Sequence, residues 1–358
     1  MQYIRFLLLP FSGIYYLIVL IRNFLFDKRF INSYCASLPV VSIGNITTGG
    51  SGKTPLIIFL AKYFISQNKS VAIIARGYKR KTKGLLVVWD GKTLKSNPAE
   101  TGDELLMITK ELISNPNQFF VIASNNRIEG IKYAEKHFSP DIVLLDDAFQ
   151  HRAVSRTTDI VILTPPHQSR YTFLYKFLIP VGNMREPYSS LRRADAIVIN
   201  FKFSRDEKQK ANYLTNLIAP HILTQTQNLN DTTRMFFTMK YKFAGFGNKD
   251  GVFDYLSQTK LILFAGIADR ESFFSFFESN KYEICAKISF PDHHFYLQKD
   301  IKKLEALYVE NCLYVTTQKD YVKIQAFKEF FNQYPIYYLK VDLEFDNFNL
   351  FKEKYLKF

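Results

Sequence analysis

Residues 40–55 read VVSIGNITTGGSGKTP. The apolar start is typical of a buried strand, and the glycine-rich turn that follows ends at Pro55, a residue that suits the first turn of a helix. A strand, a phosphate loop and a helix in this order are typical of P-loop nucleotide-binding folds. One departure is Thr47, which stands where the usual loop pattern begins with glycine. An accidental Gly-Lys-Thr turn is the alternative, and the correctly placed strand and helix argue against it.

The loop has the residue types that a nucleoside triphosphate requires. Its glycines let backbone N–H groups approach a phosphate without interference from a Cβ. Lys53 is expected to neutralise the β- and γ-phosphates, and Thr54 is expected to place its hydroxyl on Mg²⁺. ATP and Mg²⁺ are therefore the predicted cofactors. The predicted nucleotide-binding residues are Thr48, Gly49, Gly50, Ser51, Gly52, Lys53 and Thr54.

An acidic pair follows the apolar run at residues 142–145. Asp146 and Asp147 stand at the carboxyl end of a predicted strand, where one carboxylate of a P-loop protein meets Mg²⁺ or its water. Open α/β sheets bind their ligands at that edge. A helix cap or a loop carboxylate is the alternative for either residue. Beside the phosphate loop, the metal-binding interpretation is favoured.

Apolar runs alternate with helical patterns along the whole chain, which indicates parallel sheets covered on both faces. We expect two P-loop/Rossmann-like α/β/α sandwich domains with mainly parallel sheets. Residues 36–200 would form the ATP-binding domain. Residues 201–358 would form a smaller α/β domain with a hinge near its start and a strand pair around 239–246. The other strands are expected at residues 38–43, 71–75, 120–123, 142–145, 160–163, 196–199, 261–265, 313–316 and 336–341.

The amino-terminal segment is apolar and aromatic. Residues 6–21 read FLLLPFSGIYYLIVLI and are flanked by Arg5 and Arg22. The run is slightly short for a spanning helix, which needs about 20 apolar residues. No small-residue cleavage site follows, which argues against a signal peptide, and a helix of the buried core is the other alternative. We expect residues 1–35 to be membrane-associated, with a hydrophobic helix lying in the interface.

Composition narrows the class of protein further. Lys and Arg total 47 against 33 Asp and Glu in 358 residues, a net charge of +14, and such a surface favours anionic partners. The three cysteines have no CxxC or zinc spacing, and their odd number argues against a disulfide framework, which indicates a reducing cytosolic setting. The basic run at residues 79–83 lacks a nucleic-acid-reading module. We therefore expect no nucleic acid partner.

Four further clusters have reactive side chains, and each alone is more often structural than catalytic. They read GDE at 102–104, GNMREP at 182–187, FPDHH at 290–294 and TTQKD at 316–320. Together with the phosphate loop and LLDDAFQHR at 144–152, in this order, they resemble the tetraacyldisaccharide 4′-kinase family, the lipid A 4′-kinases of Gram-negative bacteria. The resemblance extends from residue 40 to residue 320. The sequence departs from the family pattern at Ala148 and Gln318, where the family usually has Gly and Glu.

The resemblance implies an enzyme of lipid A biosynthesis. It implies transfer of the ATP γ-phosphate to the 4′-hydroxyl of a tetraacylated glucosamine disaccharide 1-phosphate. The protein would be located at the cytoplasmic face of the bacterial inner membrane, and we expect it to be a monomer. A sugar hydroxyl must lose its proton during transfer, and the resemblance gives Asp103 as the base and His293 as its dyad partner.

The remaining site residues have assigned roles as well. Arg185 is expected to stabilise the transferring phosphoryl group, with Arg127 a weaker candidate, and Asp292 is expected to orient the neighbouring histidine. Because Asp103 and His293 fall in different predicted domains, domain closure would assemble the base. The predicted catalytic residues are Asp103, His293, Lys53, Asp146 and Arg185. The predicted metal ligands are Thr54, Asp146, Asp147 and Glu186, and the predicted substrate contacts are Asn45, Arg76, Gln150 and His151.

A membrane-associated P-loop ATPase or GTPase switch is the alternative function. The phosphate loop and the paired aspartates fit it equally well. A GTP-reading NKxD motif is not evident, since residues 248–250 lack the required spacing and strand context. The two functions differ in whether turnover needs a lipid disaccharide acceptor.

Overall fold

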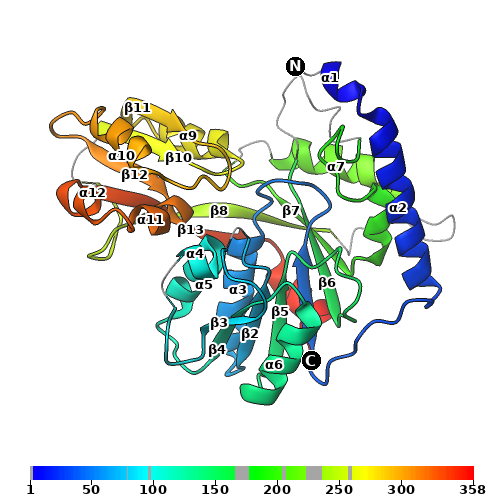
Figure 1. Cartoon of the computed structure of the whole chain (residues 1–358). Coiled ribbons are helices and arrows are strands. Elements are labelled where there is room, and N and C mark those ends of the chain that lie inside the picture. Colours follow the sequence, from blue (N-terminus) through cyan, green and yellow to red (C-terminus); the bar gives the residue numbers. More distant parts are fainter. Residues whose placement is uncertain are drawn as a thin grey trace.

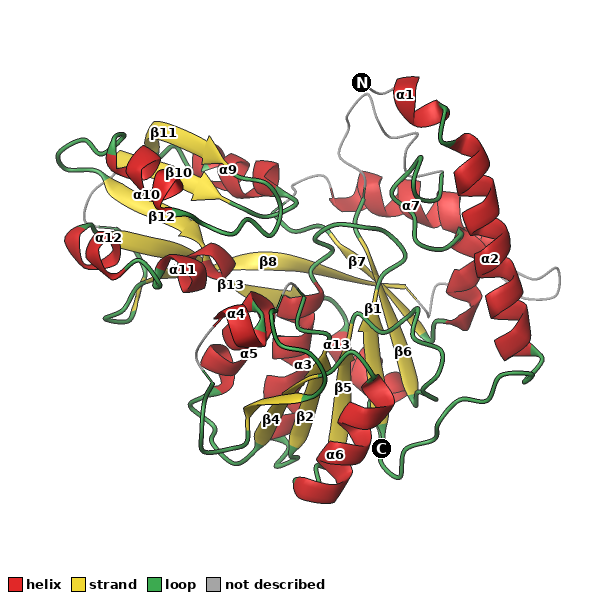
Figure 2. Ribbon diagram, in the orientation of Figure 1, coloured by secondary structure: helices red, strands yellow, loops and turns green. Residues whose placement is uncertain are grey.

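The computed structural model describes residues 3–78, 80–95, 98–165, 177–203, 207–222, 236–256 and 260–358. Its central feature is one mostly parallel β-sheet that runs through the molecule (Figures 1 and 2). The strand order is β11-β10-β12-β13-β8-β7-β6-β1-β5-β2-β4-β3, with β9 paired to β8. The strands are β1 (Val40–Gly44), β2 (Val71–Ala75), β3 (Leu86–Trp89), β4 (Phe119–Ala123), β5 (Ile142–Asp146), β6 (Thr158–Leu163), β7 (Ala196–Asn200), β8 (Phe236–Gly247), β9 (Val252–Phe253), β10 (Lys260–Ala265), β11 (Glu283–Ser289), β12 (Leu313–Thr317) and β13 (Ile336–Phe345).

Helices cover this sheet, as expected for strands that are buried along their whole length. In β1, β2, β4, β5, β6 and β7 every residue is buried. The helices are α1 (Tyr3–Phe6), α2 (Leu9–Asp27), α3 (Lys53–Ser66), α4 (Pro98–Thr101), α5 (Asp103–Leu112), α6 (Arg127–His137), the 3₁₀ helix η2 (Tyr188–Arg193), α7 (Glu207–Ile222), α9 (Arg270–Ser279), α10 (Gln298–Glu305), α11 (Gln318–Ile324), α12 (Lys328–Gln333) and α13 (Phe348–Tyr355).

The predicted mostly parallel α/β architecture is confirmed, with instructive differences in detail. The strand pair expected around residues 239–246 is a single long strand, β8, to which the short β9 and the distant β13 are antiparallel. Two strands, β3 and β11, have no counterpart in the prediction. Both lie at ends of the strand order, and residues along β11 alternate between exposed and partly buried. β11 lacks the continuous apolar run by which central parallel strands are recognised, whereas β3 has such a run, LVVW, which the prediction missed.

The two halves of the chain share the sheet instead of forming separate ones. β8 pairs with β7 in parallel and with β13 in antiparallel orientation, so these two long strands connect the halves. The carboxyl-terminal helix α13 returns to the first half, where Phe351 is fully buried in the same core as Leu56 and Leu144. The division at residue 200 stays a prediction. The packing of α13 ties residues 348–355 to the first half.

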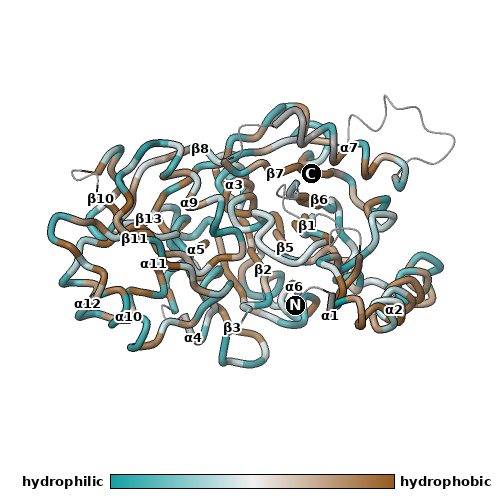
Figure 3. The backbone as a smooth tube through the Cα atoms, turned by 90° about the horizontal axis from the view of Figure 1, so that it is seen from above, coloured by the Kyte–Doolittle hydropathy of each residue, from teal (hydrophilic) through white to brown (hydrophobic). Residues whose placement is uncertain are grey.

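Helix α2 stands at one edge of the molecule, outside the sheet layers (Figures 1 and 3). Its buried residues are Ser12, Val19 and Asn23, whereas Leu17 and Ile18 are 57% and 58% exposed. Only 11% of its most apolar 18-residue stretch is buried, so α2 is not a helix of the main core. By length and composition alone, the helix is long and apolar enough to cross a membrane.

Candidate active site

The phosphate loop connects β1 to α3, and two asparagines support it through hydrogen bonds. Asn45 Nδ2 donates to Ser51 Oγ (3.0 Å), and Asn200 Nδ2, at the end of β7, donates to the Ser51 carbonyl (2.9 Å). Gly52 has φ +95°, and a Cβ there would come 2.1 Å from Asn200 Nδ2, so only glycine fits. Asn45 is fully buried beneath the loop. It supports the loop, and its predicted role as a substrate contact does not match this position.

The two carboxylates after β5 have opposite electrostatic surroundings. Asp147 lies 3.4 Å from Lys53 Nζ, and both its oxygens accept hydrogen bonds from Arg185 Nη1 (2.8 and 2.9 Å). Burial would raise the pKa of Asp147, but these two cations outweigh burial and lower it to about 2. Asp146 is buried, and burial together with the nearby Glu104 raises its pKa to about 7. Asp146 Oδ1 has no hydrogen-bond partner among the described residues.

Arg127 holds the end of β5 in place. Its guanidinium donates to the Ser124 carbonyl (2.7 Å) and to the Asp146 carbonyl (2.8 Å), and the side chain is 2% exposed. Burial lowers its pKa to about 10. Because both of its terminal nitrogens donate to backbone carbonyls and it does not line the cavity described below, Arg127 acts as a support for Asp146. Arg127 was the weaker candidate for stabilising the phosphoryl group, and this placement does not agree with that role.

Glu186 joins helix α2 to the body of the protein. Its fully buried carboxylate accepts from Arg22 (2.7 Å), Arg193 (3.0 Å) and Asn23 (3.2 Å). Burial would raise the pKa of Glu186, but the arginines outweigh burial and hold it below its usual range. The predicted metal ligation by Glu186 is therefore not supported, because both carboxylate oxygens are engaged by cations and amide groups.

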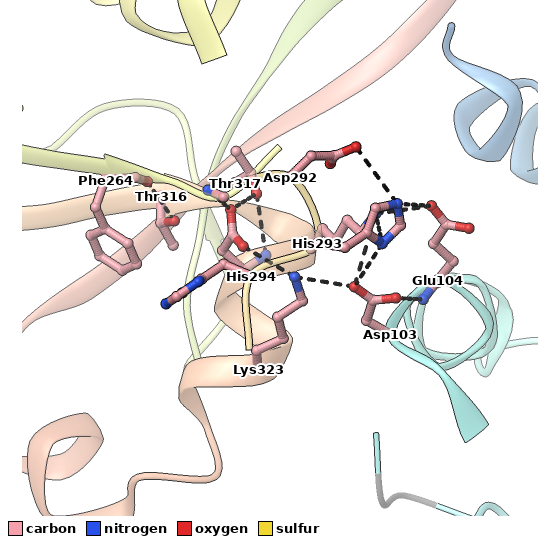
Figure 4. A network of polar contacts seen from close by, with 12 residues as sticks. Asp103, Glu104, Phe264, Asp292, His293, His294, Thr316, Thr317 and Lys323 are labelled. Carbon is pink, nitrogen blue, oxygen red and sulfur yellow. Dashed lines mark hydrogen bonds and ion pairs between the residues drawn. The ribbon is translucent and has the colours of Figure 1, made fainter. Parts of the chain in front are cut away.

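The first turn of α5 meets the second half of the chain in a network of charged groups (Figure 4). Asp103 Oδ2 lies 3.8 Å from His293 Nδ1, 3.1 Å from Lys323 Nζ and 3.9 Å from Lys319 Nζ. Burial would raise the pKa of Asp103, but the nearby His293 imidazole and the two ammonium groups hold it well below its usual range. Tyr78 packs its ring edge-on against His293, with 4.6 Å between centroids.

One cavity of about 840 Å³ joins these groups. It brings together the predicted loop residues 48–54, both Asp146 and Asp147, and His293 from the other half. Asn45, Asp103, Arg127 and Glu186 are the predicted residues of the described chain that do not line it. Asp103 therefore lies behind His293 and Glu104. The other predicted residues that line the cavity are Arg76, Gln150, His151, Arg185 and Asp292.

His151 and Gln150 lie at the edge of the cavity beyond β5. Burial, with the nearby charges of Arg127, Arg156 and Arg76, lowers the pKa of His151 to about 4, so its imidazole is neutral at pH 7. Gln150 Nε2 donates to the Asn45 carbonyl (2.8 Å), which ties this edge to the phosphate loop. Their role as substrate contacts stays a prediction.

Several cavity residues were missed at the level of sequence. Tyr15 and Arg22 on α2 line the cavity, and Tyr15 Oη donates to the Arg185 carbonyl (2.9 Å). The sequence marks Arg22 only as a cation that flanks the apolar run, and nothing in that pattern predicts a place in the cavity. Lys319 lies in the TTQKD cluster, whose individual residues have no distinctive spacing. Lys202, buried at the end of β7 and paired with Asp269, has no sequence signal that we can identify.

The fold and the cavity together define a P-loop enzyme of the α/β class. The family model for Tetraacyldisaccharide-1-P 4′-kinase matches residues 4–357, and the chain belongs to this family. A tetraacyldisaccharide 4′-kinase of Pelodictyon phaeoclathratiforme is 33% identical over 345 residues, covering 94% of this chain and 92% of that protein. The enzyme of the same name from Aquifex aeolicus is 33% identical over 327 residues, covering 90% and 91%.

A solved structure agrees with this assignment. The crystal structure of LpxK from Aquifex aeolicus in complex with ATP superimposes with a TM-score of 0.73 at 30% sequence identity. The match covers 98% of this chain and 99% of that chain. The similarity therefore extends over both halves of the sheet and over helix α2.

Proposed function

We propose that this protein transfers the γ-phosphoryl group of ATP to the 4′-hydroxyl of tetraacyldisaccharide 1-phosphate. The single observation that carries the proposal is the shared cavity, because the phosphate loop from the first half of the chain and His293 from the second half face the same space, with Asp103 behind the histidine. Membership of the family supports the same acceptor. A nucleotide switch would need no such acceptor side.

The nucleotide end of the cavity is rich in cations. Lys53 and Arg185 both contact Asp147, so the two positive groups are already gathered at one point. A triphosphate placed against the loop would compete with Asp147 for them, and its developing charge would be stabilised there. Asp147 in this way keeps both side chains in position for phosphate binding.

The residues at this end also fit Mg²⁺. Asp146 Oδ1 is a buried carboxylate oxygen with no hydrogen-bond partner among the described residues, and Thr54 and Asp147 line the same cavity. Within the described part of the chain, no three His, Cys, Asp or Glu side chains form a metal site by themselves. This agrees with Mg²⁺, which binds one or two carboxylates and completes its shell with phosphates and water. When bound, it would neutralise phosphate charge.

The acceptor end of the cavity contains the group to which we assign the proton of the acceptor hydroxyl. His293 lines the cavity, and Asp103 behind it lies 3.8 Å from His293 Nδ1. The low pKa of Asp103 keeps it ionised, which suits a carboxylate that orients an imidazole. We assign the hydroxyl proton to this dyad, with His293 as the member facing the acceptor. The resemblance had given Asp103 the leading role.

The membrane side of the proposal rests on α2. Its exposed apolar face suits the bilayer interface, while Tyr15 and Arg22 on its other face line the cavity. A lipid acceptor held in the membrane would then reach the site without leaving the interface. The proposed location is the cytoplasmic face of the bacterial inner membrane, with the protein acting as a monomer.

A phosphotransfer assay tests the proposal. Wild-type protein, γ-labelled ATP, Mg²⁺ and tetraacyldisaccharide 1-phosphate in mixed micelles should yield labelled lipid. Lys53→Ala should lose this label while keeping the wild-type thermal unfolding transition, because Lys53 is partly exposed to the cavity. Label released only as free phosphate, with or without lipid, would contradict the proposal and favour the ATPase switch.

A further inference from the structure

Lys319 is a cavity residue to which the proposed reaction has so far given no role. It lies in the first turn of α11, two positions after Thr317, whose side chain caps that helix by accepting from the Asp320 N–H. The Lys319 side chain is only 14% exposed and lines the cavity beside His293. A lysine held this far from solvent needs partners for its charge.

Its ammonium group has partners from both halves of the chain. Lys319 Nζ lies 2.9 Å from Glu104 Oε1 and 3.9 Å from Asp103 Oδ2, both on α5. The same nitrogen lies 3.0 Å from His293 Nδ1 and 3.2 Å from His293 Nε2. Figure 4 shows the Asp103 and Glu104 carboxylates turned toward the His293 imidazole.

The second half fixes Lys319 and His293 relative to each other through Gly266. Asp320, which follows Lys319, accepts from the Gly266 N–H (2.8 Å) and is fully buried. The Gly266 carbonyl in turn accepts from the His293 N–H (3.1 Å). The ammonium and the imidazole are therefore carried by one hydrogen-bonded frame, whereas the two carboxylates belong to another element.

Electrostatics make Lys319 the group that joins these parts. Asp103 and Glu104 are adjacent carboxylates at the start of one helix and repel each other. Burial lowers the pKa of Lys319, but Glu104 and Asp103 raise it by more, so the ammonium remains charged. Removing that charge would leave two carboxylates facing an imidazole with one neighbouring cation fewer.

We propose that Lys319 is a positioning residue that holds His293 against Asp103 and Glu104 across the two halves of the site. The inference rests on the proposed kinase function and adds a role for the TTQKD cluster. Lys319 would act through His293 on the acceptor side of the reaction. It would leave nucleotide binding at the phosphate loop unaffected.

The variant Lys319→Met keeps the length of the side chain and removes its charge. We expect kcat for lipid phosphorylation to fall on the order of 10- to 100-fold, since small displacements of a catalytic group have effects of this size. The KM for ATP should stay within about twofold of wild type. Lys319→Arg should recover part of the lost kcat, because a guanidinium can still hold Glu104.

Lys110→Met is the matched control. Lys110 on α5 donates to Gln325 Oε1 at the end of α11 (2.6 Å), so it bridges the same two helices without an observed contact to His293. If Lys319 only fastened α5 to α11, both variants would lower kcat alike. A kcat in Lys319→Met within about twofold of wild type, or equal to that of Lys110→Met, would overturn the inference.

A second measurement separates this inference from the proposed function. The ¹⁵N-imidazole NMR signals of His293, assigned with His293→Gln, should shift in Lys319→Met and stay unchanged in Lys110→Met. An unchanged signal in Lys319→Met would refute the positioning role even if the wild type phosphorylated lipid. A wild type that labels no lipid, with a shifted imidazole signal, would refute the kinase assignment and leave the positioning of His293 by Lys319 standing.

Discussion

Two adjacent carboxylates, Asp146 and Asp147, show how neighbouring residues acquire different chemistry. Asp147 faces Lys53 and Arg185 and stays ionised, whereas Asp146 is buried beside Glu104 and titrates at about pH 7. Identical side chains thus differ because burial favours the neutral form and nearby cations favour the charged form. Anything cationic that enters the cavity would ionise Asp146.

The pH dependence of stability should report this difference. The pKa of Asp146 rises from 3.8 to about 7 on folding, so between these values the native state binds a proton that the unfolded state does not. The contribution is fully present below the unfolded pKa and is lost as pH rises through the folded pKa. Without nucleotide or magnesium, the free energy of unfolding of wild type should fall by roughly 2 kcal/mol more than that of Asp146→Asn between about pH 5 and about pH 8.

Urea unfolding of both proteins across this pH range checks the expectation. Asparagine cannot ionise, so the free energy of unfolding of Asp146→Asn should fall less steeply with pH. Parallel pH profiles for the two proteins would show that Asp146 does not carry the raised pKa.

The dyad makes a kinetic prediction at the same scale. Asp103→Asn and His293→Gln should each lower kcat by roughly two to four orders of magnitude, the usual weight of acid–base catalysis. Because the two side chains act as a unit, the double variant should be little worse than either single one. Steady-state kinetics with saturating ATP measure this. Multiplying effects in the double variant would mean that the two residues act independently.

At the scale of single elements, helix α2 serves two partners at once. One face is tied to the body by the buried carboxylate of Glu186 through Arg22, and the other exposes apolar side chains.

Gln318 also links two elements, since its amide donates to Glu111 and so joins α11 to α5. The glutamate that is usual in the family at this position would instead face another carboxylate.

Glu186→Gln tests the anchoring of α2. The change leaves Arg22 and Arg193 facing a neutral side chain in a buried setting, and we expect a loss on the order of 3 kcal/mol in the free energy of unfolding. Glu344→Gln is the control, because its ion pair with Lys240 lies at the surface, with the Glu344 side chain 55% exposed. That change should cost about 0.5 kcal/mol or less. Equal losses in urea unfolding would contradict the anchoring role of Glu186.

The exposed face of α2 should set membrane affinity. Replacing Leu17 and Ile18 by serine removes two apolar side chains that are more than half exposed, and should weaken binding to anionic vesicles roughly 100-fold. Thermal unfolding should be unchanged, since neither side chain is buried in the protein. Tyr255→Ser, at a residue 79% exposed elsewhere, should leave vesicle sedimentation unaltered. Wild-type binding by the double variant would refute an interfacial role for α2.

At the scale of the whole molecule, the first half depends on the end of the chain. Phe351 and Tyr355 of α13 pack edge-on against Phe237 of β8, and Thr158 Oγ1 donates to the Tyr355 carbonyl (2.8 Å). β8 also supplies the only described partner of β7 on its outer side. The nucleotide-binding half is therefore completed by residues beyond 200.

Expression of residues 36–200 alone tests this dependence. The fragment lacks β8 and α13, so an apolar edge of β7 and part of the core would face water. We expect no cooperative thermal transition in near-ultraviolet circular dichroism, in contrast to the full chain. A sharp transition near that of the full chain would instead support residues 36–200 as an autonomous domain.

The features that the sequence by itself determined are those defined by residues close together along the chain. The phosphate loop, the acidic end of β5 and the buried central strands are continuous stretches, and each is defined by residue types a few positions apart. The mostly parallel α/β class follows from them, because apolar strands separated by helices have few other ways to be buried. Family motifs then extended the prediction to the reaction.

Only the tertiary structure decided which distant charges meet. Glu186 pairs with Arg22 across 164 positions, and Lys319 reaches Glu104 across 215 positions. The pairing of β8 with β13 makes one sheet of the two halves. A charged side chain has no local signature of its partner, since attraction depends on distance in space and on exclusion of water. That is why Glu186 was expected at a metal, whereas its carboxylate anchors helix α2 through Arg22.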